Sequence, residues 1–600
     1  MSAVKQSAAA LLSSRRFPYV AATLAVVLCL PALSFGFFAD DYMHRAMFLQ
    51  PVELSGMFGH PFPDMFTLAD GDPERMHRFV DKGLYPWLTL PELKFRFMRT
   101  VAVVTHWIDY ALWPNSPALM HVHNLLWFGA LVVAVAFYYR RMIGPGITAG
   151  LAALIFAIDD AHAWPAAWIA NRNEMIALLL GVLVMTCHDR SRQSANRPAA
   201  LAASVLFAVA LFTKESAISI CGYLFAYAIF LDKSTAAKRI LSLAPYAAIT
   251  VLWRAYYVYA GYGSFGSQEY VDPVAAPVQF ARALIERTPI LLQGLWGLPP
   301  SDLYSIGPSV AKPYVFATGV IGIVVVAALL TPLLRRDPLA RFFAVGMLLA
   351  IVPIVAAGPQ DRLLMFATLG SSGLLAQLLV AVHKRELFDS PTRRTHRCAR
   401  GMYYAFIAIH LVLAPILLPG TIYAVDEAGN SIMDISVKGI PTGPEVQDKT
   451  IVLTNFANYP AATYLYIVRG LSGAPTPAHV RSLAPPLMYP VPIWLTRTDE
   501  RTIVAEPDGG YPWSLFRDAD HPLAAGQRIE LTGMTVEVLA LSEEGWPARV
   551  AYHFDKPLED PSLLWFRIEG VELPPTVGET IYTTPFGVSN EARAPGPLSP

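Results

Sequence analysis

The chain has 600 residues, of which 54% are hydrophobic and only 15% are charged. Soluble globular chains carry about 25% charged residues, so this composition favours a membrane protein. The 46 basic and 46 acidic residues balance, which leaves no electrostatic basis for nucleic-acid binding. The four cysteines lack metal-site spacing and imply no disulfide framework.

Hydropathy predicts a polytopic α-helical membrane region over residues 17–420, because a helix needs about 20 apolar residues to cross the hydrocarbon core. About eleven stretches meet or approach this length, and they lie at 17–38, 118–139, 145–159, 172–187, 198–213, 215–231, 239–259, 313–334, 339–357, 361–382 and 401–419. The apolar segment Pro289–Pro300 is too short to span and predicts a re-entrant or interfacial segment.

Clusters of Lys and Arg in the short loops predict the orientation, since such residues stay on the cytoplasmic side. Six clusters alternate with the apolar stretches so that all fall on one side: Arg15–Arg16, Arg140–Arg141, Arg190–Arg197, Lys233–Arg239, Arg335–Arg341 and Lys384–Arg400. Residues 1–16 are therefore expected in the cytoplasm, and the first outer loop (39–117) on the far side. A cleaved signal peptide ending near Ala32–Ser34 is the alternative, but about 20 apolar residues exceed the usual h-region.

Hydropathy falls after Leu418, and residues 440–600 are predicted to form a mostly-β domain on the periplasmic side, after a linker at 421–439. Strands are expected at Thr450–Thr454, Ile493–Arg497, Arg501–Ala505, Arg528–Leu541, Arg549–Phe554 and Leu563–Ile568. Glu543–Gly545 predicts a hairpin turn and Tyr459–Arg469 a helix. No nucleophile or metal constellation stands out in this sequence, so a scaffold or binding module is the expected role.

Ionisable residues at membrane depth are costly and point to function. Here they gather where the apolar stretches reach the outer side: Asp40–Asp41, Asp159–Asp160 with His162, Arg172 with Glu174, Lys214–Glu215 and Asp361–Arg362. The set predicts an outward-facing polar cavity in which a carboxylate takes a proton from an acceptor hydroxyl and Arg or Lys stabilises a phosphate leaving group. The alternative is that these charges are ordinary helix-end residues or structural ion pairs.

The acid pair Asp40–Asp41 is the leading candidate for catalysis, because two acids directly after an apolar run are poorly explained by packing. Adjacent residues do not share one helical face, so one acid is expected to act as base while the other positions a substrate or a metal. The pair permits a divalent cation such as Mg²⁺ or Mn²⁺ without requiring one. Of the histidines nearby, only His121 and His123 lie close in sequence, and structural roles are favoured over a zinc site.

An ordered series of short stretches resembles the GT-C superfamily of glycosyltransferases, nearest the protein O-mannosyltransferases and the transmembrane-and-TPR O-mannosyltransferases. The stretches that carry the resemblance are Phe38–Tyr42, Arg99 with Asp109–Leu112, His121–Leu126, Ala167–Glu174, Thr213–Ala217 and Asp361–Leu363. Thr100 stands where the family has proline after the arginine, and Asp160 and Trp164 depart from a His-Pro-x-His-x-Glu pattern. No TPR array follows the membrane region.

The resemblance implies an enzyme that uses a polyprenyl- or dolichyl-phosphate sugar. It assigns the base to Asp40 or Asp41 and the donor-phosphate contacts to Arg172, Lys214 and Arg362. Asp160, His162, Glu174, Glu215 and Asp361 are expected to complete the polar cavity. The expected reaction is direct, inverting transfer to a hydroxyl of a glycan, lipid or protein acceptor at the periplasmic face of a bacterial inner membrane.

Two other functions fit the same composition. A lipid or glycan transporter or flippase would need a polar path across the whole membrane, and the apolar stretches contain few charges and no paired Pro/Gly breaks. A non-catalytic envelope assembly protein would act through residues 440–600.

Overall fold

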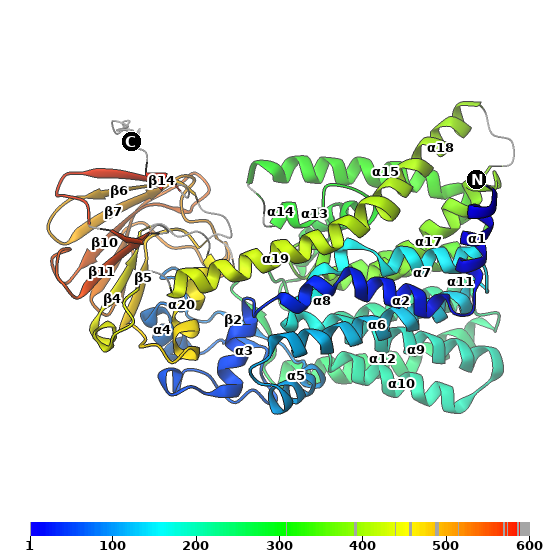
Figure 1. Ribbon diagram of the computed structural model, residues 1–600, viewed down its shortest axis with the longest axis horizontal. Coiled ribbons are helices and arrows are strands. Elements are labelled where there is room, and N and C mark those ends of the chain that lie inside the picture. Colours follow the sequence, from blue (N-terminus) through cyan, green and yellow to red (C-terminus); the bar gives the residue numbers. More distant parts are fainter. Residues whose placement is uncertain are drawn as a thin grey trace.

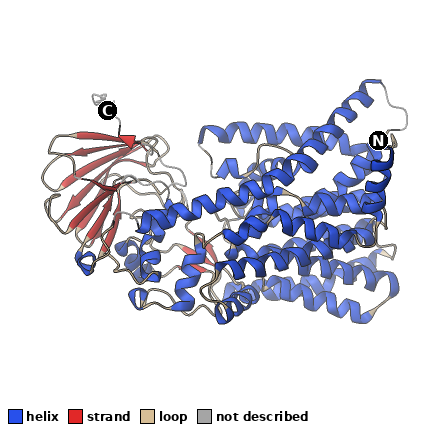
Figure 2. Cartoon of the chain, in the orientation of Figure 1, coloured by secondary structure: helices blue, strands red, loops and turns tan. Residues whose placement is uncertain are grey.

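The computed structural model describes residues 2–588 apart from 306, 308, 389–392, 438–439, 455–458, 487–490, 514, 568–569, 573 and 585–586. Helices form one end of the elongated molecule and strands the other, with the N-terminus at the far end of the helical part (Figures 1 and 2). The fold therefore has a helical region rich in apolar residues and a β-rich C-terminal region, as the sequence predicts.

Every predicted apolar stretch coincides with helical structure. The main helices of this region are α1 (Ser2–Ser13), α2 (Phe17–Leu28), α6 (Pro117–Met142), α7 (Ile147–Ala157), α9 (Arg172–Ser194), α10 (Arg197–Leu211), α11 (Ile220–Phe230), α12 (Ala236–Tyr259), α13 (Pro277–Trp296), α15 (Lys312–Arg336), α16 (Pro338–Ile354), α17 (Met365–His383), α18 (Arg393–Ile407) and α19 (Ala414–Val437). Within the described residues, five helices are long and apolar enough to cross a membrane, or seven if two bent pairs each count as one span. The number of about eleven crossings remains a prediction, because several of the apolar helices are short.

The first predicted span, 17–38, is an α-helix only as far as Leu28. A 3-10 turn follows at Leu30–Ser34, and Phe35 is already extended. Pro31 explains the change, since proline lacks an N–H and its ring clashes with the preceding turn of an α-helix. The chain therefore leaves the bundle early and approaches the acid pair as a short irregular segment.

The predicted linker 421–439 is helical as far as it is described. α19 continues to Val437, and the π-helical turn Ala408–Leu413 joins it to α18. Ile422 and Val425 are buried along it. In Figure 1, α18 and α19 run from the end that holds the N-terminus to the strands, so helical structure connects the two regions.

Basic residues from separate loops meet at one end of the helical bundle. Arg140 donates to the carbonyl oxygen of Ser14 at 2.8 Å, Arg141 pairs with Asp189 at 2.5 Å and Arg192 pairs with Asp232 at 2.8 Å. This shared end agrees with the predicted grouping of the clusters. Its assignment to the cytoplasm is part of the proposal below.

The first outer loop is an ordered layer between the helices and the C-terminal strands. It contains α3 (Asp40–Leu49), β1 (Thr67–Asp70), α4 (Pro73–Lys82), β2 (Lys94–Arg96) and α5 (Thr100–Leu112). β1 and β2 pair antiparallel, and β3 (Gly263–Phe265), from the segment after α12, adds to β2. This pairing fixes two distant loops together above the bundle.

Five of the predicted strands coincide with observed strands, but the prediction of Arg528–Leu541 as a single strand is wrong. This segment forms two strands that pair as a hairpin, because Gly533 between them has a φ of +78° and turns the chain. In the described part of the chain, β14 (Gly587–Val588), β13 (Thr580–Thr584), β6 (Ile493–Arg497), β7 (Thr502–Pro507), β10 (Pro547–Phe554), β9 (Met534–Leu541) and β8 (Arg528–Leu531) form one antiparallel sheet in that order. A second sheet has the order β12 (Gly570–Glu572), β11 (Leu563–Arg567), β4 (Thr450–Leu453), β5 (His479–Ser482). The predicted helix is α20 (Tyr459–Leu471), which connects the parallel strands β4 and β5. Ile568, the last residue of one predicted strand, lies outside the described residues.

The first outer loop and the C-terminal region share one hydrophobic core. Trp87 of the loop packs edge-on against Tyr511 with a ring-centroid distance of 5.4 Å, and both side chains are buried. Gly83 lies so close to Val480 that a Cβ at Gly83 would overlap the Val480 carbonyl, and its φ of +88° favours glycine. The two regions are thus packed as one body.

Candidate functional site

The acid pair begins α3, at the end of the helical bundle nearest the C-terminal strands (Figure 1). Ala39, directly before it, has φ 44° and ψ −114°, a backbone conformation that residues with a Cβ rarely adopt. Such strain is found most often at functional sites, where surrounding contacts hold the chain in place. The carboxylates of Asp40 and Asp41 have different partners, and each is described in turn.

Asp41 points into the protein and holds two backbone segments together. It is only 2% exposed, and its carboxylate accepts hydrogen bonds from the backbone N–H groups of Phe38 at 3.1 Å and Ala170 at 2.8 Å. Burial raises the pKa of Asp41 to about 8, although these two donors act to lower it. Asp41 therefore joins the irregular segment that ends at Phe38 to the Trp168–Ala170 turn.

Asp40 is half-buried and faces cationic side chains. Its Oδ1 accepts a hydrogen bond of 2.8 Å from the hydroxyl of Tyr464, and the guanidinium groups of Arg362 and Arg99 favour its charged form. Burial raises the pKa of Asp40, while Tyr464 and the two guanidinium groups oppose this rise. Among the described residues, Oδ2 of Asp40 has no hydrogen-bond donor.

Two cations, Arg362 and Arg99, act electrostatically on Asp40, and a third, Lys214, interacts with both of them. Arg362 stacks over the ring of Trp168 at 5.0 Å and donates to Gln360, with no carboxylate among the described residues within ion-pair distance. Arg99 pairs with Glu215 at 3.1 Å, and Lys214 pairs with Glu174 at 2.7 Å. Arg99 and Arg362 both act electrostatically on Lys214, so the three form one positive group.

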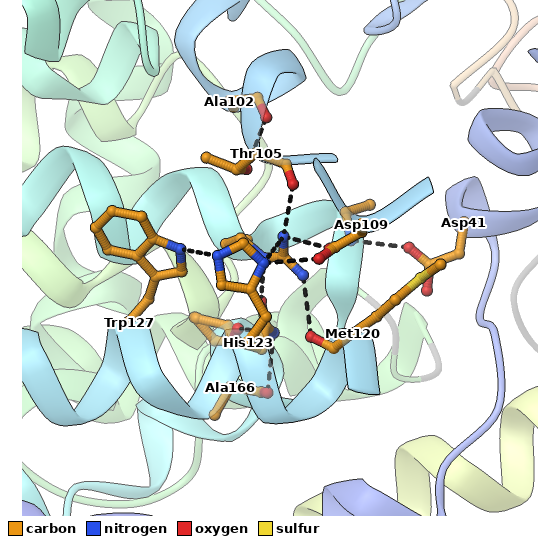
Figure 3. A network of polar contacts seen from close by, with 12 residues as sticks. Asp41, Ala102, Thr105, Asp109, Met120, His123, Trp127 and Ala166 are labelled. Atoms are coloured by element: carbon orange, nitrogen blue, oxygen red, sulfur yellow. Dashed lines mark hydrogen bonds and ion pairs between the residues drawn. The ribbon is translucent and has the colours of Figure 1, made fainter. Parts of the chain in front are cut away.

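Arg172 lies deeper, in a network formed by α5, α6 and α9 (Figure 3). Neither Arg172 nor Asp109 has exposed side-chain surface, and they pair at 2.6 Å. The remaining guanidinium nitrogens donate to Asn124 Oδ1 at 2.7 Å and to the Met120 carbonyl at 3.0 Å. With protein acceptors on all sides, Arg172 is presented to Asp109 rather than to the space beside Asp40.

His123 extends the same network toward the surface. Its Nδ1 lies 2.7 Å from Asp109, and the indole N–H of Trp127 donates to its Nε2 at 2.9 Å. Figure 3 shows Asp41 at the edge of this network with its carboxylate turned toward it. His121, the neighbour of His123 in the sequence pattern, instead contacts the Gly36 carbonyl at 3.1 Å.

The remaining predicted residues form two further groups. Glu174 and Glu215 neutralise Lys214 and Arg99, as described above. Asp160 and Asp361 line a separate hollow, which also has Asp159, Gly294 and His410 in its wall. His162 is fully buried between the rings of Phe128 and Phe156, at centroid distances of 5.6 and 4.6 Å, and does not line this hollow.

The acid pair does not form a divalent-cation site in this arrangement. Within the described ranges, no group of three or more His, Cys, Asp or Glu side chains is placed to hold a metal ion. Asp40 and Asp41 turn toward different partners, so their oxygens do not converge on one point. The donor set therefore fits a single carboxylate acting on a proton better than a shared metal ion.

Sequence reasoning missed Tyr464 and the stacking role of Trp168. Tyr464 is 424 residues from Asp40 along the chain and lies in a region that offers no catalytic pattern. Trp168 and Arg99 both fall within the stretches that resemble GT-C motifs, so a signal for them was present in the sequence. Arg99 has no assigned role in the sequence analysis, because Lys214 and Arg362, the other cations near it, are far away along the chain.

Comparison with known proteins finds no matching family model and no matching curated protein. Among solved structures, the chain is similar to the Archaeoglobus fulgidus oligosaccharyltransferase in its apo form, with a TM-score of 0.39, 12% identity and coverage of 76% of this chain. The same archaeal enzyme, AglB, in complex with an inhibitory peptide and a dolichol-phosphate gives a TM-score of 0.39 and 10% identity over 78% of this chain. ArnT from Cupriavidus metallidurans in the apo state gives 0.35 and 12%, covering 68% of this chain and 81% of its own.

The chain spans a little under two thirds of the archaeal oligosaccharyltransferase, at 64% and 65% of the two matched chains. With identities of 12% or less and TM-scores of 0.39 or less, these similarities do not assign the chain to a family.

Proposed function

We propose that this protein is a GT-C-type membrane glycosyltransferase that moves a sugar from a polyprenyl-phosphate donor to an acceptor hydroxyl. One observation carries the proposal: the half-buried carboxylate of Asp40, whose Oδ2 has no hydrogen-bond donor in the described part of the chain, lies within the electrostatic reach of Arg99 and Arg362. A base beside cations is the arrangement that proton removal and phosphate departure both require.

The reaction is a direct displacement at the anomeric carbon. Asp40 Oδ2 takes the proton of the acceptor hydroxyl, whose oxygen forms the new bond to the anomeric carbon. The bond from that carbon to the phosphate oxygen breaks, and its electron pair leaves with the polyprenyl phosphate. One displacement inverts the anomeric centre. The proton, the new bond and the leaving group are all accounted for without a metal ion.

Arg362 is the proposed main contact of the donor phosphate. Its guanidinium is held by the face of Trp168 rather than by a carboxylate, so its charge remains available to an anion. Arg99 and Lys214 add positive potential but share it with Glu215 and Glu174. We assign Arg172 to the scaffold instead, because Asp109 already neutralises it.

The proposed setting is a bacterial inner membrane, with the acid pair and the β-rich region on the periplasmic side. The Lys and Arg clusters that meet at the opposite end support this orientation through the positive-inside rule. The lipid part of the donor would lie against the apolar helices. Proposed acceptors are hydroxyls of a glycan, a lipid or a protein.

The test is transfer of labelled sugar by the purified full-length protein in lipid nanodiscs, with a panel of polyprenyl-phosphate sugars. Asp40→Asn should reduce kcat by about 10²–10⁴-fold, the usual contribution of a positioned general base. Asp70→Asn is the matched control, since Asp70 lies in the same outer loop and pairs with Arg75 away from Asp40. Transfer that persists at the wild-type rate in Asp40→Asn would overturn the assigned base.

Arg362 has its own test in the same assay. Arg362→Ala should raise KM for the donor, while Arg362→Lys keeps the charge but loses the planar stacking on Trp168 and should give an intermediate value. Donor-dependent flux across proteoliposomes without any transfer would instead favour a transporter.

A further inference from the structure

α20, a helix of the C-terminal region, packs directly against α3, the helix that begins with the acid pair. Tyr464 of α20 is 6% exposed, and its ring lies 6.2 Å from that of Tyr42, a close neighbour of Asp40 on α3. Further along α20, a Cβ at Gly470 would lie 2.6 Å from Leu54, so the helix backbone rests closely on the outer loop. Two points along α20 are thus fixed against the loop that carries Asp40.

Polar contacts hold the rest of the C-terminal region in the same position. Asp81 of the loop accepts from the Thr532 N–H at 2.7 Å and pairs with Arg481 at 3.2 Å. Arg517 donates to the Leu88 carbonyl at 2.7 Å. Charge-assisted bonds of this kind fix orientation as well as contact. The place of Tyr464 therefore follows from the docking of the whole region.

We propose that Tyr464 is a positioning residue for the Asp40 base, so that the C-terminal region completes the reactive centre. This inference rests on the function proposed above. The Tyr464 hydroxyl donates to Oδ1 at 2.8 Å and keeps its own proton. It holds the carboxylate in one orientation and leaves Oδ2 to receive the proton of the acceptor.

The hydrogen bond from Tyr464 also changes the pH at which Asp40 ionises. Burial raises the pKa of Asp40, and the hydrogen bond from Tyr464 opposes this rise because it favours the charged carboxylate. Removing the hydroxyl should therefore move the protonation midpoint of Asp40 to higher pH. At any pH within the titration range of Asp40, a smaller fraction of the carboxyl is then ionised and able to act as base.

The experiment compares Tyr464→Phe with Tyr466→Phe in the full-length protein. Tyr466 lies on the same helix with the same 6% exposure, but its hydroxyl contacts Thr476 at 3.4 Å instead of Asp40. pH-dependent infrared difference spectra, with Asp40→Asn used to identify the Asp40 carboxyl band, give the protonation midpoint without any substrate. Sugar transfer across the same pH range gives kcat and the donor KM.

Tyr464→Phe should move the infrared midpoint of Asp40 to higher pH, shift the acid limb of kcat with it by the same amount, and lower kcat on that limb. The donor KM should stay the same, and Tyr466→Phe should behave as wild type. A midpoint in Tyr464→Phe equal to that in Tyr466→Phe overturns the inference. If no donor gives transfer with any variant, the proposed function fails, and the infrared midpoint alone still decides whether Tyr464 acts on Asp40.

Discussion

Arg172 and Asp109 form an ion pair of 2.6 Å in which neither side chain has exposed surface. A buried pair of this kind does little for stability as a whole, but removing one partner leaves the other charge buried and uncompensated. The effect of substituting Arg172 can therefore distinguish two roles. Loss of a scaffold residue should lower stability, whereas loss of a phosphate ligand should weaken donor binding.

Arg172→Ala should lower the free energy of unfolding by about 3–5 kcal/mol, because it leaves the Asp109 carboxylate unpaired. Thermal unfolding of the purified variant in detergent measures this. Arg190→Ala, at an exposed position of the same helix α9, is the control and should be nearly neutral. An unchanged Tm together with a raised donor KM would instead make Arg172 a phosphate ligand.

Asp41 should make stability depend on pH. Burial raises the pKa of Asp41 to about 8, above its value in the unfolded chain, so the folded state binds the extra proton. The stabilising contribution is complete below about pH 4 and is lost as the pH rises through about 8.

The measurement is Tm between pH 5 and pH 9 for wild type and Asp41→Asn. The Tm of wild type should fall relative to that of Asp41→Asn as the pH rises, since asparagine does not titrate. A constant difference over this range would show that the Asp41 carboxyl does not titrate there.

Gly83→Ala should separate the C-terminal region from the first outer loop. A Cβ at this position overlaps the Val480 carbonyl, in addition to the backbone cost of a side chain at φ +88°. Gly56→Ala is the matched control, because Gly56 has φ +76° in the same loop with no atom near its Cβ position. Gly56→Ala should cost about 1 kcal/mol, and Gly83→Ala clearly more, by Tm and by protease sensitivity of the loop.

Residues 440–600 expressed alone should not unfold cooperatively. Their core includes side chains such as Tyr511, which in the full protein is covered by Trp87 of the outer loop. Separation exposes these apolar surfaces to water. Calorimetry of the isolated segment is the measurement, and a sharp transition like that of the full protein would contradict the shared core.

The same test bears on an assembly role. A segment that does not fold alone should not rescue a deletion phenotype when it is expressed alone in the periplasm. Full rescue by this segment would favour a function carried by residues 440–600 rather than by the acid pair.

Local sequence patterns predicted many of the elements but not the contacts between them. The apolar stretches predicted the helices because hydropathy is a property of neighbouring residues, and alternation predicted β6 and β10 for the same reason. The early end of α2 was also readable, since Pro31 stands in the sequence. In contrast, the helix through the predicted linker depends on Ile422 and Val425 packing against other segments, which no local pattern shows.

The site was predictable in part for a similar reason. Charges in apolar surroundings made Asp40, Lys214 and Arg362 candidates, because ionisable residues are costly there. The structure places Arg362 within electrostatic reach of Asp40, while the roles of these residues stay predictions. The partner of each charge was not visible. Asp109 neutralises Arg172 from another helix, and Tyr464 reaches Asp40 from the far end of the chain, so both depend on tertiary structure.

The helical connection from α18 to α19 constrains which insertions and deletions this protein can tolerate during evolution. A helix turns by about 100° per residue, so one inserted or deleted residue in α19 would rotate everything beyond it by that angle. The β-rich region would then meet the outer loop with a different face, and α20 would lose its place on α3. Length variation should therefore concentrate in surface turns such as Glu543–Gly545, while the residue count of α19 stays fixed.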